Sequence, residues 1–303
     1  MFALAGGGRR LTNPVLATVV AFAAPLVLLT AGTALLDLLG VPVLDGSSGG
    51  SALDGALLLL LQNVFPFGLI ALFLFVWVAL YEGRGPRSLG LGPAGAGRAY
   101  SRGLVLGVLM FGAAVGAAAL LGFAAWDRGT DPALRGAGVL GAVLLTYAGW
   151  AVQGSTEELL TRGWLLQAVG VRWGAPAGVL ISSAVFTVLH SLNPNLSPIS
   201  VLNLFLVGVF LALWVLLEGG LWGVFAWHAA WNWAQGNVFG YQVSGATFPG
   251  GALFDLREAG PDAITGGAFG PEGGLAVTLV LLVGIAVVVA LARRGVAKRT
   301  PGA

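Results

Sequence analysis

The chain alternates long apolar runs with short polar segments, a pattern that predicts a bundle of membrane-spanning helices. A run of about 20 apolar residues, bounded by charge, glycine or proline, can cross the hydrocarbon layer as a helix. Eight runs meet this description: 14–36, 57–80, 104–125, 137–168, 175–193, 198–217, 220–241 and 275–292. The fourth is longer than a bilayer requires, so we expect it to tilt or to protrude.

Composition supports this interpretation. Of the 303 residues, 57% are hydrophobic and only 9% are charged, too little charge for the surface of a water-soluble protein of this size. The predicted fold class is therefore all-α, a polytopic membrane protein with about eight transmembrane helices. The chain has no cysteine, which excludes disulfides, thiolate metal sites and a cysteine nucleophile.

The distribution of basic residues predicts the orientation. Lys and Arg concentrate in cytoplasmic loops of membrane proteins. With the N-terminus inside, the inner segments hold eleven basic residues and the outer segments hold three, Arg128, Arg135 and Arg257; the inner ones are Arg9, Arg10, Arg84, Arg87, Arg98, Arg102, Arg172, Arg293, Arg294, Lys298 and Arg299. We expect a multi-pass protein of the cell membrane with both termini in the cytoplasm. The dispersed basic residues and the net charge of +2 give no support for nucleic-acid binding.

Ionisable residues within the apolar runs are confined to the second half of the chain. They are Glu157, Glu158 and Arg162 in the fourth run, His190 in the fifth and His228 in the seventh. Such a side chain at bilayer depth costs roughly 2.5–3.5 kcal/mol on insertion scales, so each one is a candidate functional residue. The two histidines are the only ones in the chain.

Helical spacing groups these residues into pairs. Glu158 and Arg162 are four residues apart, so the arginine can neutralise and orient the carboxylate, either as a structural ion pair or in support of a site. Glu157 points about 100° away around the helix and is left free for chemistry. His228 and Asn232 also share a helix face, where they could serve a site or bond between helices.

The depth of the residues provides a second check. A turn at 172–176 would join the fourth and fifth runs, and it lies 16 residues beyond Glu157 and 17 before His190 if it is centred on Trp173. The two side chains then lie at one level, roughly 25 Å from the turn at ~1.5 Å per residue. His228 reaches this level if the turn projects about 12 Å into the cytoplasm.

Three ordered motifs resemble those of a known family. Glu157-Glu158-Leu-Leu-Thr-Arg162, Phe186-Thr-Val-Leu-His190 and His228-Ala-Ala-Trp-Asn232 are similar to the motifs EExxxR, FxxxH and HxxxN of the CAAX-protease and bacteriocin-processing (CPBP, or Abi) intramembrane proteases, which include the Ras-converting enzyme. One departure is Thr161, where many members carry an aromatic residue. The resemblance covers roughly 137–241.

The resemblance implies a membrane-embedded endopeptidase. By analogy with its prenyl-protein members, Glu157 and His190 would hold the attacking water, and His228 with Asn232 would bind the oxyanion. Glu158 and Arg162 would support them, and Phe186, four residues before His190, would pack beside the imidazole as an ordinary core residue would. On this basis we expect four parts in the chain. They are N-terminal helices and loops at 1–136, a protease-like core with predicted helices four to seven at 137–241, an extracytoplasmic loop at 242–274, and a last helix with a basic tail at 275–303.

Two alternatives stay open at this stage. Two carboxylates and two histidines, Glu157, Glu158, His190 and His228, could instead hold a zinc ion, although the chain has no HExxH; we favour a mechanism without a cofactor. The polar cluster could also belong to a non-catalytic immunity factor, scaffold or transporter that binds a partner or protons. The expected substrate is a membrane-embedded or lipidated peptide within the bilayer, and the sequence does not determine its identity or the oligomeric state.

Overall fold

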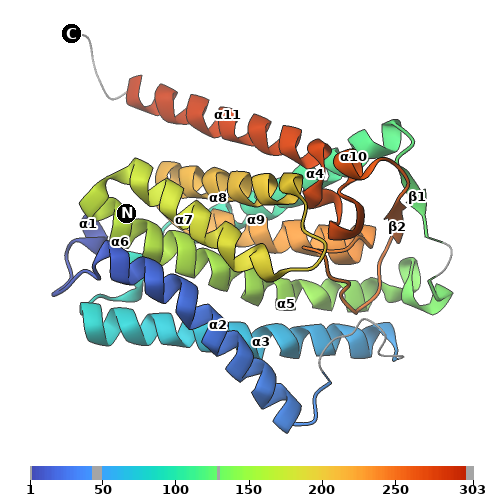
Figure 1. Ribbon diagram of the computed structural model, residues 1–303, viewed down its shortest axis with the longest axis horizontal. Helices are drawn as coiled ribbons and strands as arrows, with labels where there is room; N and C mark the ends of the chain where they lie inside the picture. The colour runs from blue at the N-terminus through green and yellow to red at the C-terminus, as the bar shows by residue number, and fades with distance from the viewer. Residues whose placement is uncertain (1, 43–49, 128–129, 298–303) are drawn as a thin grey trace.

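The computed structural model describes residues 2–42, 50–127 and 130–297, which fold mainly into long helices (Figure 1). The helices are α1 (Phe2–Ala5), α2 (Pro14–Leu38), α3 (Ala52–Val76), α4 (Ala96–Leu120), α5 (Leu140–Glu158), α6 (Leu166–Trp173), α7 (Ala175–Leu189), α8 (Pro198–Glu218), α9 (Trp222–Trp233), α10 (Asp262–Thr265) and α11 (Leu275–Ala297). Within the described residues, seven helices are long and apolar enough to cross a membrane. The all-α polytopic membrane fold is confirmed.

Three of the long helices contain a π-helical segment. These segments are Trp77–Glu82 after α3, Leu159–Leu165 between α5 and α6, and Ala234–Phe239 after α9. The second one makes α5, its π segment and α6 parts of a single long helix, Ala137–Trp173, which is the predicted long fourth run. π-Helical turns are frequent at functional sites, and this one begins directly after Glu158.

The predicted span 220–241 differs from the other seven. It is helical over 222–239, yet it is not among the helices apolar enough to cross a membrane. The reason is its position, because α9 packs against α4 and α5 and every residue from Gly223 to Asn232 is buried. A helix enclosed by other helices does not face lipid and can carry polar residues.

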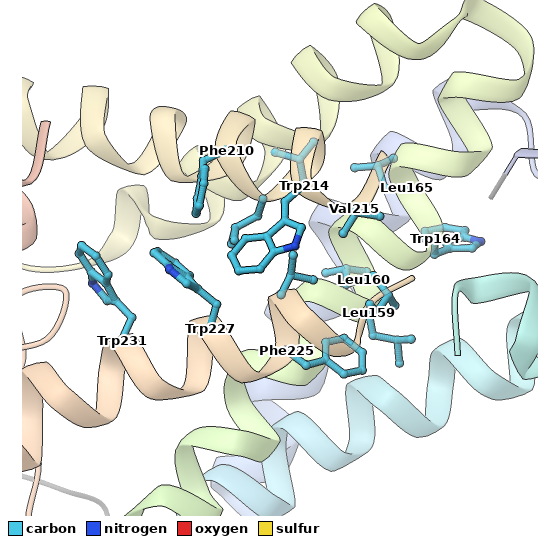
Figure 2. Packing of buried hydrophobic residues seen from close by; sticks show 14 of the residues in the cluster. Leu159, Leu160, Trp164, Leu165, Phe210, Trp214, Val215, Phe225, Trp227 and Trp231 are labelled. Carbon is cyan, nitrogen blue, oxygen red and sulfur yellow. The ribbon is translucent and has the colours of Figure 1, made fainter. Parts of the chain in front are cut away.

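A close approach of α4 holds α9 in this position. A Cβ on Gly103 would lie 2.0 Å from the Gly223 carbonyl oxygen, and one on Gly107 would lie 2.6 Å from the Trp227 carbonyl oxygen. Only glycine fits at these crossings. Aromatic side chains fill the space on another side of α9, where the Trp227 and Trp231 rings stack at 4.8 Å and Phe210 meets Trp227 edge-on (Figure 2).

Two helices, α3 and α4, begin earlier in the structure than the sequence predicts. α3 begins at Ala52 rather than residue 57, because Ser51 and Asp54 form a capping box at its start. α4 spans Ala96–Leu120 rather than 104–125, so that Arg98 and Arg102 lie in its first turns instead of a loop. Arginine is tolerated near a helix end because its long side chain can reach the aqueous interface.

The two described ends of the chain lie at the same end of the bundle. α1 and the C-terminal end of α11 are both on the left in Figure 1, as is the turn at Gly174 between α6 and α7. This turn lies where the sequence predicts it. Which end faces the cytoplasm stays a prediction, and Arg128, Lys298 and Arg299 of the basic count lie outside the described residues.

The opposite end is closed by the segment 242–274, which the sequence predicts as a loop. It contains β2 (Leu256–Glu258), which pairs antiparallel with β1 (Ala124–Trp126), together with the one-turn helix α10. The segment is therefore ordered by contacts with the rest of the chain, and it lies against the ends of the helices (Figure 1, right).

Glu258 in β2 gives a pH-dependent contribution to stability. Burial raises the pKa of its carboxyl from the ordinary 4.5 to about 7, and no hydrogen bond reaches its buried Oε1 from the described residues. Because the folded state binds this proton more tightly than the unfolded state, the contribution is full below about pH 4.5 and is lost as the pH rises through about 7. We expect the melting temperature of the wild type to fall between pH 5 and 8 more steeply than that of Glu258→Gln. Parallel pH profiles of the two proteins would contradict this assignment.

Candidate active site

The polar residues singled out in the sequence meet in one cavity of about 270 Å³ in the interior of the bundle. Glu157 from α5, His190 directly after α7, and His228 and Asn232 from α9 line it, and so does Phe186. Glu158 and Arg162 lie behind this layer, both with 0% of the side chain exposed. Three segments that are far apart in sequence thus contribute to one site.

Glu157 lies close to both histidines. Its Oε2 lies 3.8 Å from Nε2 of His190 and 3.8 Å from Nε2 of His228. The contact with His190 confirms that the two side chains lie at one level of the hairpin. Its Oε1 accepts a hydrogen bond from Nε2 of Gln153 at 2.6 Å, which fixes the carboxylate plane.

The orientation of His190 follows from one hydrogen bond to its own helix. Nδ1 lies 2.8 Å from the Phe186 carbonyl oxygen, which can only accept, so Nδ1 carries the proton. In the neutral ring, Nε2 then presents a lone pair toward Glu157. The Phe186 ring packs against the imidazole with centroids 4.4 Å apart, the contact that the four-residue spacing predicts.

Glu158 connects two residues. Its Oε1 accepts from Nη1 of Arg162 at 2.9 Å, as the four-residue spacing predicts, and from Nδ1 of His228, also at 2.9 Å. The carboxylate therefore orients His228 directly, so that Nε2 of this ring faces the cavity. The bond to His228 was not foreseen, because Glu158 and His228 are 70 residues apart.

Arg162 is enclosed by groups that stabilise its charge. Its guanidinium lies 4.6 Å over the Phe186 ring, and Nη1 also donates to the Thr161 hydroxyl at 2.7 Å. Thr161 in turn donates to the Glu157 carbonyl oxygen at 2.6 Å. The threonine that departs from the family pattern thus joins the hydrogen-bond network.

Gln153 is a residue that sequence reasoning missed. Besides donating to Glu157, it accepts through Oε1 from Nδ2 of Asn232 at 2.9 Å, and so it bridges two predicted site residues. A signal was available, since Gln153 precedes Glu157 by four residues and is a polar residue at the same helix face. Gln153 is neither ionisable nor part of the three motifs, on which the prediction rests.

One protein-family description matches the part of the chain that contains the three motifs. Residues 138–234 match the family described as type II CAAX prenyl endopeptidase Rce1-like. This part of the chain is therefore similar to the CAAX intramembrane proteases. No curated protein and no solved structure matched the chain. The matched segment contains all three motifs, from Glu157 to Asn232.

The wall of the cavity includes residues beyond the matched segment. Ser244 and Glu272, both from the segment that closes the end of the bundle, line it. The Ser244 hydroxyl donates to Oε1 of Glu272, and Asn203 of α8 donates to the Glu272 carbonyl oxygen at 2.8 Å. Burial raises the pKa of the Glu272 carboxyl, while the Ser244 hydrogen bond and the neighbouring His190 and His228 act in the opposite direction. Nothing in the linear sequence connects Glu272 to the motifs.

The arrangement of the candidate site does not favour the zinc alternative. Among the described residues, no group of three or more His, Asp or Glu side chains is arranged to hold a metal ion. Glu158 and His228, two of the four suggested ligands, are bonded to each other, and the same Glu158 oxygen also binds Arg162. A zinc ligand set needs its donor atoms directed at one point about 2.0–2.2 Å away. We therefore derive no step that passes through a metal.

Proposed function

We propose that the chain is an intramembrane endopeptidase in which Glu157 and His190 activate a water molecule. The distance that carries the proposal is the 3.8 Å between Glu157 Oε2 and His190 Nε2. It is too long for a direct hydrogen bond, yet one water molecule can contact both atoms. Both atoms are acceptors in the state described above, and a water has two protons to donate.

The reaction uses the residues in a fixed order. Glu157 takes one proton from the water while His190 Nε2 accepts the second in a hydrogen bond, and the water oxygen attacks the peptide carbonyl carbon. The carbonyl oxygen becomes an oxyanion, which the protonated Nε2 of His228 and an Nδ2 hydrogen of Asn232 stabilise. The C–N bond then breaks, and Glu157 returns its proton to the leaving amine nitrogen.

The supporting residues fit these roles. Glu158 favours the protonated form of His228 by accepting from Nδ1, and Arg162 offsets the carboxylate charge in turn. Gln153 directs Glu157 through Oε1, which leaves Oε2 for the water, and it also positions the Asn232 carboxamide. Fixed dipoles of this kind need no rearrangement during the reaction.

The substrate class is based on the apolar residues that also line the cavity. α2 and α3 contribute several of them, among them Leu26, Leu29 and Phe67. A peptide with an apolar or lipidated segment would bury that segment against them. We therefore propose a membrane-embedded or lipidated peptide as the substrate.

The test is cleavage by the purified protein in lipid vesicles. The probes are a peptide ending in a prenylated cysteine and three further residues, the same peptide without the lipid, and a hydrophobic transmembrane peptide, with products identified by mass spectrometry. We expect the wild type to cleave at least the lipidated or the transmembrane probe, and to keep its activity after treatment with a strong chelator. Glu258→Gln, a matched substitution outside the cavity, should keep it too.

Two outcomes would contradict the proposal. A folded protein that cleaves none of the three probes would favour a non-catalytic role for the polar cluster. Activity that is lost with the chelator and restored by added Zn²⁺ would replace the glutamate mechanism with a metal-dependent one.

A further inference from the structure

A second, larger hollow lies between α4, α8 and α11, away from the catalytic cavity. It is a groove of about 1120 Å³ with apolar walls, to which Leu106, Leu109, Val283 and Val287 contribute. α11 approaches the bundle closely at Gly284, where a Cβ would lie only 3.0 Å from the Phe210 ring. Toward its C-terminal end, α11 diverges from α8 (Figure 1).

The groove is positively charged where it meets the N-terminal end of α4. Arg98 and Arg102 of α4 and Glu218 of α8 line it. Arg102 is paired with Glu218 at 2.5 Å, whereas Arg98 is exposed and has no carboxylate within ion-pair distance among the described residues. Arg294 lies three residues beyond Leu291 on the face of α11 that lines the groove. The arginines thus exceed the acidic groups here.

The dimensions of the groove match one leaflet of a bilayer. Arg98 and Leu109 are 11 residues apart on α4, or ~16 Å along the helix axis at ~1.5 Å per residue. Half of a hydrocarbon core of about 30 Å is about 15 Å. A lipid whose phosphate lies at Arg98 would therefore place its acyl chains along the apolar part of the groove.

We propose that this groove binds one anionic phospholipid, with its phosphate at Arg98 and Arg102 and its acyl chains between α4, α8 and α11. The excess of arginine selects an anionic over a zwitterionic headgroup, since a basic residue near a membrane surface contributes about 1 kcal/mol toward anionic lipid. In the predicted orientation, the lipid comes from the cytoplasmic leaflet.

The lipid would lie against the structure that supports the catalytic helix. Met110 lines the groove, and its Sδ accepts from Nε1 of Trp227 at 3.3 Å. Trp227 directly precedes His228, and it lines the catalytic cavity. Phe210 also lines the groove, and its ring meets Trp227 edge-on (Figure 2). The bound acyl chains would thus complete the packing of α9 on the side away from the substrate.

The experiment compares two lipids that differ only in headgroup charge. Phosphatidylglycerol and phosphatidylcholine with identical acyl chains are added to the full-length protein in detergent, and binding is followed by native mass spectrometry and by thermal unfolding. We expect one phosphatidylglycerol to bind preferentially and to raise the melting temperature more. Arg98→Gln should weaken phosphatidylglycerol binding about fivefold, and Arg98→Lys should retain most of it.

Two further variants complete the design. Arg257→Gln removes an exposed arginine from β2 at the other end of the bundle and should leave the preference unchanged. Val283→Trp fills the groove and should weaken binding of both lipids. Equal binding of the two lipids by the wild type would overturn the proposal. A preference for phosphatidylglycerol that survives Arg98→Gln would overturn it too, and so would unchanged binding of both lipids by Val283→Trp. None of these readouts depends on peptidase activity.

Discussion

Glu157→Gln is expected to lower kcat for peptide cleavage by about 10²–10⁴-fold, the usual contribution of a general base. The substitution is nearly isosteric, and the carboxamide oxygen can still accept the hydrogen bond that Gln153 donates to Oε1. What it removes is basicity at the position 3.8 Å from both imidazoles. The loss should therefore appear in kcat, measured with the peptide that the wild type cleaves in vesicles.

The control for this prediction separates chemistry from folding. Glu157→Gln should unfold within a few degrees of the wild type, because its hydrogen bond is kept, and Glu258→Gln should retain full activity under the same conditions. A Glu157→Gln protein with wild-type kcat would exclude Glu157 as the base. A large fall in melting temperature would instead identify Glu157 as a structural residue.

Arg162→Met is expected to destabilise the protein by about 3–5 kcal/mol, the usual cost of removing one partner of a buried ion pair. Arg162 and Glu158 both have 0% of their side chains exposed, so no water can replace the guanidinium, and the Glu158 carboxylate is left with its hydrogen bond to His228. The substitution also removes the guanidinium that lies over the Phe186 ring. The measurement is unfolding of the purified protein by a denaturing detergent, followed by circular dichroism.

The double variant Glu158→Gln, Arg162→Met distinguishes the charge effect from lost packing. Removing both charges should restore much of the stability lost in Arg162→Met, because no unpaired charge stays buried. It should not restore activity, since a glutamine at 158 cannot favour the protonated form of His228. If the two substitutions instead destabilise additively, Glu158 and Arg162 do not act as a pair.

Much of the candidate site follows from spacing along single helices. The pairs Glu158 with Arg162 and Phe186 with His190 are four residues apart, and each makes the contact that helix geometry predicts. The level of Glu157 relative to His190 follows from counting residues on the two sides of one turn. Such predictions succeed because a helix fixes distances between near neighbours whatever surrounds it.

The same reasoning fails where a contact joins segments that are distant in sequence. His228 and Asn232 share a face of α9, yet each is bonded to a different residue of α5, to Glu158 and to Gln153 respectively. Glu272 enters the cavity from the segment that closes the bundle. These partners depend on how the helices are rotated against one another, which no local spacing specifies.

The sequence by itself determined the helical membrane fold, because long apolar runs without charge can satisfy their backbone hydrogen bonds in lipid only as helices. It also predicted the ionisable residues of the candidate site, because each is costly at bilayer depth, but it did not indicate Gln153 or Glu272. The tertiary structure decided which of these residues contact one another. Packing of α9 between α4 and α5 brings His228 to Glu158 and encloses a helix that its own composition would not place across a membrane. Long-range packing sets these contacts, since it depends on the shapes of all the surrounding side chains together.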